Sequence, residues 1–206
     1  MSDIAAFSAL SPTTLADCMA RDRVMDFGIR PLWPGMPRLA GPAYPVRCEP
    51  GDNLMLHAAI HRAPAGVVIV VQAGDNDFAV CGGNVCAVAQ RRGIAGFVVD
   101  GVVRDLAETR DLGFAVFVRG VVPIPGGKSK GGVLDGPVRC GGVDVAPGDI
   151  VVGDEEGVVV VPRDRAGEVL ISAQARAKAD AATSLDAWET AHRARVEAIL
   201  REKGIV

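Results

Sequence analysis

Two continuous apolar runs alternate with helical patterns in the first half of the chain. The runs Gly66–Val71 and Gly96–Asp100 are typical of strands that are buried on both faces. A loop rich in Gly, Asp and Asn separates the first run from a helical pattern between Asn84 and Arg92. Strand, loop, helix and strand within about 35 residues predict a βαβ unit with a right-handed crossover. A short helix after Arg104 and a strand over Phe114–Arg119 extend the unit.

Capping residues and proline mark the elements that precede this unit. Two short helices are expected near the N-terminus, because Ser11 is a good N-cap and Pro12 suits the first helical turn. The Pro- and Gly-rich stretch 31–50 predicts loops with one strand near Ala43–Cys48. Asp52 then predicts a helix from Asn53 to about Arg62.

The residue pattern changes twice in the second half of the chain. Residues 123–142 are rich in Gly and predict loops with a short strand, and two valine-rich runs around residues 153–157 predict a hairpin. From Arg163 the pattern is helical to about Lys203, with a break near residues 183–184. We therefore expect a single α/β catalytic domain with a mixed sheet over residues 1–162. A helical extension over residues 163–206 would follow, and its narrow apolar stripe would pack on a neighbouring subunit.

Composition narrows the class of protein and its partners. Of the 206 residues, 49% are hydrophobic and 23% are charged, a balance typical of a globular domain. The net charge of −3 and the absence of a basic run argue against a nucleic-acid partner. No apolar run approaches the ~20 residues that span a bilayer, and no signal peptide is seen. Five cysteines without a C-x-x-C pair favour free thiols, so a cytoplasmic location is expected.

Two loops carry the candidate chemistry, because enzyme sites in α/β sheets gather at the carboxyl ends of strands. The first loop ends with Gly82-Gly83 at a predicted helix start. The free amides of Asn84, Val85 and Cys86 would form an anion cradle there. The two glycines would let a ligand approach the backbone closely.

The second loop follows the strand that ends at Asp100 and contains Arg104-Asp105. Arg104 offers a planar fork that suits a carboxylate or an enolate oxygen. Asp105 offers a hard oxygen ligand that suits Mg²⁺. The spacing alone favours an ion pair between these adjacent residues on the surface.

The residues around these loops resemble one family. Gly83, Arg104, Asp105 and Glu108 follow the pattern G-X20-R-D-X2-E/D, and the block Gly96–Asp105 is similar to the family's core. Further similar segments are Phe114–Phe117, Arg119-Gly120, Gly141-Gly142, Pro147–Asp149 and Asp154–Pro162. The chain thus resembles the RraA-like family, named for regulator of ribonuclease activity A, over roughly residues 10 to 170. The resemblance implies a layered β/β/α swivelling-domain sandwich with N-terminal helices and a C-terminal helical tail.

Asp105 places the resemblance in the branch of class II pyruvate aldolases, which act on 4-hydroxy-4-methyl-2-oxoglutarate and 4-carboxy-4-hydroxy-2-oxoadipate. That branch implies metal-dependent retro-aldol cleavage of a small 2-oxo acid to pyruvate, with oxaloacetate decarboxylation as a side activity. Asp105 would bind Mg²⁺, Mn²⁺ or another divalent cation, and Arg104 would hold the pyruvoyl oxygens. The substrate carboxylate would lie against the segment Gly82, Gly83, Asn84 and Val85.

Two features of the resemblance leave alternatives open. The aldolases usually carry an acid where Gly83 stands, and Asp100, Asp75 or Asp77 are the candidates to replace it. The family also takes a C-terminal Glu from a neighbouring subunit of a trimer or hexamer, for which Glu189 and Glu197 qualify. The alternative function is a non-catalytic regulator that binds a ribonuclease or another protein.

Overall fold

Three parallel strands form the centre of the sheet in the computed structural model, which describes residues 3–205. They are β3 (Val68–Gln72), β4 (Gly96–Val103) and β5 (Val116–Val121), with Val70 opposite Val98 and Val98 opposite Phe117. The crossovers between them contain α4 (Gly83–Arg91) and α5 (Leu106–Leu112). The expected βαβ unit and its extension are therefore confirmed.

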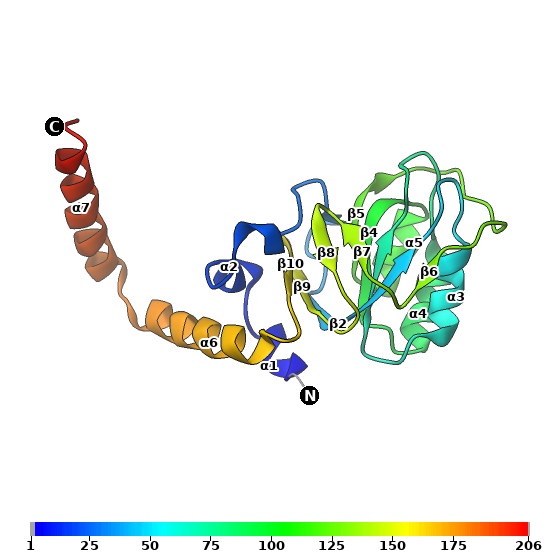
Figure 1. The fold of residues 1–206 in the computed structure, drawn as a ribbon, viewed down its shortest axis with the longest axis horizontal. Helices are drawn as coiled ribbons and strands as arrows, with labels where there is room; N and C mark the ends of the chain where they lie inside the picture. The colour runs from blue at the N-terminus through cyan, green and yellow to red at the C-terminus, as the bar shows by residue number, and fades with distance from the viewer. Residues whose placement is uncertain (1–2, 206) are drawn as a thin grey trace.

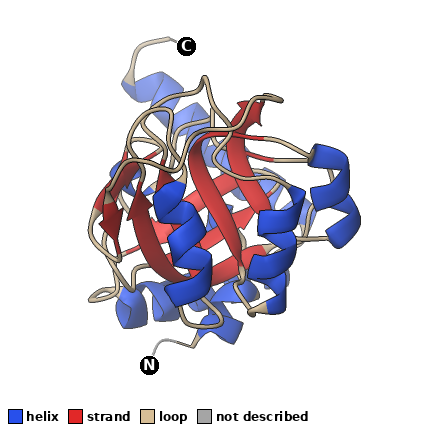
Figure 2. Ribbon diagram, turned by 90° about the vertical axis from the view of Figure 1, so that its right-hand side faces the viewer, coloured by secondary structure: helices blue, strands red, loops and turns tan. Residues whose placement is uncertain are grey.

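The strand β2 (Leu39–Arg47) joins this parallel half to an antiparallel half. It pairs with β3 in parallel and with β9 in antiparallel orientation, and the full order is β1-β5-β4-β3-β2-β9-β10, with β6 also on β2. The result is a mixed, nearly closed sheet (Figure 2). The remaining strands are β1 (Arg30–Pro31), β6 (Val133–Leu134), β9 (Ile150–Asp154), β10 (Gly157–Val161) and a separate hairpin of β7 (Val138–Cys140) with β8 (Val143–Val145).

Helices lie at both ends of the described chain, as expected. Ser11 accepts a hydrogen bond from the amide of Thr14 at 3.1 Å and caps the second helix. Ser184 caps the last helix in the same way through the amide of Ala187 at 3.2 Å, which confirms the break near residues 183–184. These helices are α1 (Ile4–Ser8), α2 (Pro12–Ala16), α6 (Ala166–Ala182) and α7 (Leu185–Glu202), with a 3₁₀ turn at Arg21–Arg23.

The structure differs from the expectation around Asp52. The helix α3 (Leu54–Arg62) has Asn53 at its N-cap position, and the Asn53 side chain makes no capping bond. Instead one Asp52 oxygen accepts from the amide of Leu54 at 2.9 Å. The other accepts from the amides of Ser129 at 2.6 Å and Lys130 at 3.1 Å. Asp52 therefore accepts from the first amide of the helix and also fixes the Gly-rich loop, a tertiary role that a capping pattern does not reveal.

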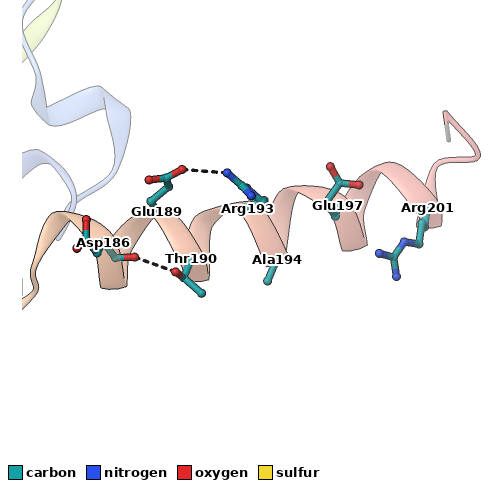
Figure 3. A pocket seen from close by; sticks show the side chains of 7 residues that line it. All are labelled: Asp186, Glu189, Thr190, Arg193, Ala194, Glu197 and Arg201. Carbon is teal, nitrogen blue, oxygen red and sulfur yellow. Dashed lines mark hydrogen bonds and ion pairs between the residues drawn. The ribbon is translucent and has the colours of Figure 1, made fainter.

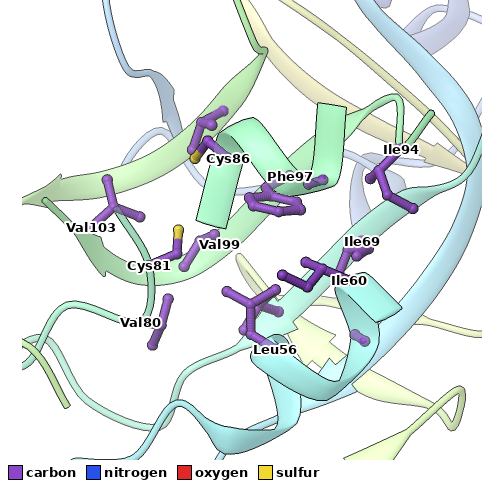
Figure 4. Packing of buried hydrophobic residues seen from close by; sticks show 14 of the residues in the cluster. Leu56, Ile60, Ile69, Val80, Cys81, Cys86, Ile94, Phe97, Val99 and Val103 are labelled. Carbon is purple, nitrogen blue, oxygen red and sulfur yellow. The ribbon is translucent and has the colours of Figure 1, made fainter. Parts of the chain in front are cut away.

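Three apolar layers hold these elements together. One lies between the sheet and the helices α3 and α4, and includes Leu56, Ile69 and Phe97 (Figure 4). A second lies between the other face of the sheet and the β7–β8 hairpin, and a third lies under α1, α2 and α6. Valine dominates all three layers, because its branched side chain packs well on a pleated surface.

The C-terminal helix α7 stands apart from these layers. No residue of α7 is buried, and Figure 1 shows the helix at the opposite end of the molecule from α4 and α5. Its large apolar side chains are exposed, including Leu185 at 75% and Trp188 at 52%. Within residues 3–205, no helix combines the length and apolar character required to cross a membrane.

Candidate functional site

Two consecutive glycines open a space at the N-terminus of α4. A Cβ atom on Gly82 would overlap the carboxylate of Asp105 and lie 2.9 Å from Cγ of Arg104. A Cβ atom on Gly83 would overlap the carboxylate of Glu108 and lie 2.9 Å from its Cβ. Both positions therefore require glycine, because only a residue without a side chain lets the two carboxylates approach the first turn of α4.

Asp105 is held in an unusual backbone conformation at this point. Its φ of 59° lies in the left-handed region, where a residue other than Gly costs roughly 1 kcal/mol or more. Its carbonyl accepts from both the amide and the hydroxyl of Thr109, each at 3.0 Å. Its carboxylate accepts from the amide of Gly83 at 3.1 Å. These contacts aim the carboxylate at the positive end of the α4 dipole.

Arg104 lies beside this carboxylate. Its Nε atom is 3.5 Å from Oδ2 of Asp105, and the two side chains are 41% and 34% exposed. Its amide donates to the carbonyl of Cys81 at 2.9 Å, which ties the two candidate loops together. The surface ion pair considered from the spacing is thus present, yet at partial exposure such a pair contributes little stability. The guanidinium keeps donors that face solvent.

The expected anion cradle is partly filled by the chain itself. The amides of Val85 and Cys86 donate to the carbonyl of Gly82 at 3.0 and 3.1 Å, and the amide of Gly83 donates to Asp105. The expectation that Val85 and Cys86 offer free amides was wrong, because the first turn of α4 closes on Gly82. Within residues 3–205, no protein group accepts a hydrogen bond from the amide of Asn84.

The acid next to Gly83 is Glu108. Glu108 belongs to the motif, but the sequence did not predict a role for it. The alternatives Asp100 and Asp75 make hydrogen bonds to other parts of the chain. Asp100 accepts from Arg119 and from the amide of Gly141, and Asp75 accepts from the amides of Gly51, Asp77 and Phe78. Asp77 belongs to that same turn. The signal that identifies Glu108 is its position one helical turn after Asp105.

A network next to this site fixes the edge of the sheet. Arg119 donates to both oxygens of Asp26, at 3.0 and 2.7 Å, and to Asp100. The hydrogen bonds from Arg119 hold the pKa of Asp26 below its ordinary value, despite the opposing effect of burial. The network joins the N-terminal segment, through Asp26, to Asp100 in the middle of β4, the strand that leads to Arg104.

Gly83 and Glu108 also border a shallow depression of about 370 Å³ between α4 and α5, whereas Arg104 and Asp105 do not line it. Its lining consists of Gly83, Asn84, Ala87, Glu108, Asp111 and Leu112. Within residues 3–205, no group of three or more His, Cys, Asp or Glu side chains converges as metal ligands. At this position the described chain offers the carboxylates of Asp105 and Glu108, the two acids that lie against Gly82 and Gly83.

The C-terminal glutamates lie on α7, far from this site. Glu189 pairs with Arg193 at 3.0 Å, and Glu197 projects from the same face (Figure 3). A second depression of about 580 Å³ borders this charged face. Because α7 is at the other end of the molecule (Figure 1), neither glutamate reaches the Asp105 site of its own chain.

Comparison with known proteins gives a consistent family. The profile of the RraA-like family (Aldolase/RraA) matches residues 12–160. A protein of Halalkalibacterium halodurans, provisionally named 4-hydroxy-4-methyl-2-oxoglutarate aldolase, is 37% identical over 180 residues, which are 87% of this chain and 85% of that protein. A protein of Burkholderia multivorans with the same provisional name is 37% identical over 139 residues, which are 67% of this chain and 84% of that protein.

Solved structures of similar fold carry different names. An uncharacterised protein of Pseudomonas syringae has a TM-score of 0.77 at 28% identity, over 91% of this chain and 92% of that one. A Streptomyces coelicolor member of the RNase ES inhibitor RraA family has a TM-score of 0.74 at 31% identity, over 93% and 96%. The mixed α/β fold with helices at both ends is therefore shared with RraA proteins. Together with the matched profile and the relatives at 37% identity, this shows that the chain belongs to the RraA-like family.

Proposed function

We propose that this protein is a divalent-metal-dependent lyase that cleaves 4-hydroxy-2-oxo acids to pyruvate and a second oxo acid, and that it also decarboxylates oxaloacetate. The observation that carries the proposal is the placement of Asp105. A strained backbone and the amide of Gly83 hold its carboxylate between Arg104 and Glu108. Strain kept at an exposed polar position is typical of a functional site.

The donor set fits a hard cation such as Mg²⁺. Asp105 and Glu108 both supply carboxylate oxygens, which Mg²⁺ and Mn²⁺ prefer, and Gly82 and Gly83 leave room for both. Asp105 would hold the ion directly, and Glu108 would hold it or its bound water. When bound, the cation supplies Lewis-acid polarisation of the 2-oxo group.

Arg104 and the backbone of α4 would bind and orient the substrate. The guanidinium of Arg104 would offer a planar fork to the pyruvoyl oxygens and balance the negative charge of the enolate that develops there. The amide of Asn84 and the dipole of α4 would orient the substrate carboxylate. Both cleavage of the C3–C4 bond and loss of CO₂ from oxaloacetate leave the same pyruvate enolate, so one arrangement serves both reactions.

The test is pyruvate release from oxaloacetate and from 4-hydroxy-4-methyl-2-oxoglutarate, with Mg²⁺ or with EDTA, after subtraction of an enzyme-free blank. We expect Mg²⁺-dependent turnover that falls at least ~100-fold in Asp105→Asn. Asp22→Asn is a matched control, since Asp22 is 71% exposed on the 3₁₀ turn and outside the site. Full activity of Asp105→Asn in EDTA would overturn the mechanism.

We further propose that the protein works as a homo-oligomer, a trimer or a hexamer. The support is α7, which carries exposed Leu185, Trp188, Val196 and Ile199 and has no buried residue of its own. An amphipathic helix of this kind gains stability by packing its apolar stripe on another chain. Glu189 or Glu197 of a neighbouring subunit would then approach the Asp105 site. Sedimentation velocity would give the oligomeric state.

The second candidate function is a regulator that binds a ribonuclease without catalysis. It is favoured by the structural relatives, which include an RNA-processing inhibitor from Thermus thermophilus at 29% identity and a TM-score of 0.67. The two candidates separate in one pair of assays. No pyruvate from any 2-oxo acid, together with inhibition of a purified RNase E-type ribonuclease, would favour the regulator.

A further inference from the structure

Asp105 is the N-cap residue of α5, but it does not cap that helix. An aspartate in this position normally has an extended backbone, from which its carboxylate accepts a hydrogen bond from the first turn of its own helix. Asp105 instead has a left-handed backbone, with φ of 59° and ψ of 47°, and makes no capping bond to α5. Its carboxylate accepts from the amide of Gly83 at 3.1 Å. The carboxylate has therefore been turned from the first turn of α5 to the first turn of α4.

These two backbone states of Asp105 differ in their local cost. The extended state is open to any residue, whereas the left-handed state disfavours a residue that has a Cβ atom. The contacts of Asp105 must therefore favour the left-handed state. The bond to Gly83 lies at a carboxylate that is 34% exposed, where water competes for the same oxygen. A buried contact at the backbone of Asp105 is protected from that competition.

Thr109 supplies such a contact from one turn further along α5. Its amide and its hydroxyl both donate to the carbonyl of Asp105, each at 3.0 Å. The bond from the amide is the ordinary bond of a helix to the fourth preceding residue, and the bond from the hydroxyl is additional. Because Thr109 is only 1% exposed, water does not replace the carbonyl as the acceptor of this hydroxyl.

We infer that Thr109 is a positioning residue, whose hydroxyl keeps Asp105 in the left-handed backbone and thereby keeps its carboxylate at the N-terminus of α4. Two donors on one carbonyl fix the peptide plane that follows Asp105, and so restrict the ψ angle of that residue. The consequence for catalysis rests on the proposed function, in which Asp105 holds the divalent cation directly. Thr109 is buried and would act only through Asp105.

Two other threonines of the chain make the same kind of bond in a different setting. The hydroxyl of Thr183 donates to the carbonyl of Ala179 at 2.8 Å. The hydroxyl of Thr190 donates to the carbonyl of Asp186 at 2.9 Å. Both threonines are exposed, and both acceptors lie within α6 or α7, where the helix already fixes the backbone. The role of Thr109 thus depends on the backbone of its acceptor, and Thr190 provides a matched control.

The experiment compares Thr109→Val, Thr109→Ser and Thr190→Val in the full-length protein. Valine keeps the shape of threonine and lacks the hydroxyl, whereas serine keeps the hydroxyl and lacks the methyl group. Hydrogen exchange of the Gly83 amide, followed by NMR in protein labelled at its glycine nitrogens, reports how often the Asp105 carboxylate leaves that amide. Isothermal titration calorimetry with Mg²⁺ alone reports the affinity for the cation.

We expect Thr109→Val to raise both the exchange rate of Gly83 and the Kd for Mg²⁺ by about 3- to 10-fold, the factor that corresponds to one hydrogen bond. Thr109→Ser and Thr190→Val should each stay within about 2-fold of the unmodified protein. A purely structural role of Thr109 predicts the opposite order, because loss of the buried methyl group would then make the serine variant the worse of the two.

An unchanged exchange rate of Gly83 in Thr109→Val would overturn the inference, and so would a larger effect in Thr109→Ser. If the valine variant folds poorly, the comparison of Thr109→Ala with Thr109→Ser isolates the hydroxyl in its place. Failure of the proposed function looks different. The unmodified protein would then bind no Mg²⁺ and release no pyruvate, while the exchange rate of Gly83 would still decide the role of Thr109.

Discussion

Replacing Gly82 by Ala tests the geometry of the candidate site most directly. The new methyl group would overlap the carboxylate of Asp105 and lie 2.9 Å from Cγ of Arg104, whereas ordinary contacts of this kind begin near 3.4 Å. The φ of Gly82 is −154°, a value that Ala adopts without strain. The substitution therefore acts through this contact and not through the backbone.

The expected cost follows from the hydrogen bond that must break. The carboxylate of Asp105 has to move by about 1 Å or more, which removes its bond to the amide of Gly83 (3.1 Å). A hydrogen bond to a charged group contributes about 1.5–3 kcal/mol, and the 34% exposure of Asp105 favours the lower end. Ala also reduces the conformational entropy of the unfolded chain, which offsets part of this cost. We therefore expect a net loss of about 1 kcal/mol or more in the free energy of unfolding. A displacement of about 1 Å can also lower kcat/KM about 100-fold.

Gly167→Ala is the matched control, because a Cβ on Gly167 meets nothing within 4 Å and the residue lies in α6. We expect it to be neutral or to stabilise the protein by about 0.5–1 kcal/mol. Urea unfolding and pyruvate release, normalised to folded protein, would be measured for both variants. Equal stability and equal kcat/KM for Gly82→Ala and Gly167→Ala would refute the role given to the glycine.

Further predictions concern the loop, the pH dependence and the last helix. Asp52→Ala should lower the free energy of unfolding by about 3 kcal/mol in urea titrations, because it leaves the amides of Leu54, Ser129 and Lys130 without an acceptor. A loss below about 1 kcal/mol would contradict this. Burial lowers the pKa of His57 to about 4, so stability should fall as pH drops from about 6.5 toward 4, by about 1 kcal/mol at pH 5 for this half-buried ring. His57→Gln should flatten that part of the profile, and an unchanged slope would exclude His57 as its cause. Trp188→Glu should shift sedimentation toward monomer, whereas Thr190→Glu, on the charged face of the same helix, should not.

The pH prediction has a second, separate window at lower pH. The amides of Ser129, Leu54 and Lys130 outweigh the effect of burial and lower the pKa of Asp52. A carboxylate with a depressed pKa in the folded state stabilises the protein above its unfolded pKa and loses that contribution as pH falls through the folded value. The loss from Asp52 therefore begins below the ordinary value of 3.8, beneath the range in which His57 acts.

Local patterns in the sequence were sufficient for most of the secondary structure. Continuous valine runs identified β3 and β4, Ser11 marked a helix start, and the hairpin of β9 and β10 followed from its turn. Such features depend on neighbours within a few residues, so periodicity and capping report them directly. The motif residues Arg104 and Asp105 were recognised for the same reason, since they are adjacent in the chain.

Tertiary structure alone decided which groups meet at the site. The left-handed backbone of Asp105, the engagement of Val85 by Gly82 and the commitment of Asp100 to Arg119 all depend on how separate loops pack against each other. The same packing brings Glu108 to the space beside Gly83. The sequence shows which carboxylates are available. Which of them occupies a given space depends on the hydrogen-bond donors that each one meets in the folded chain.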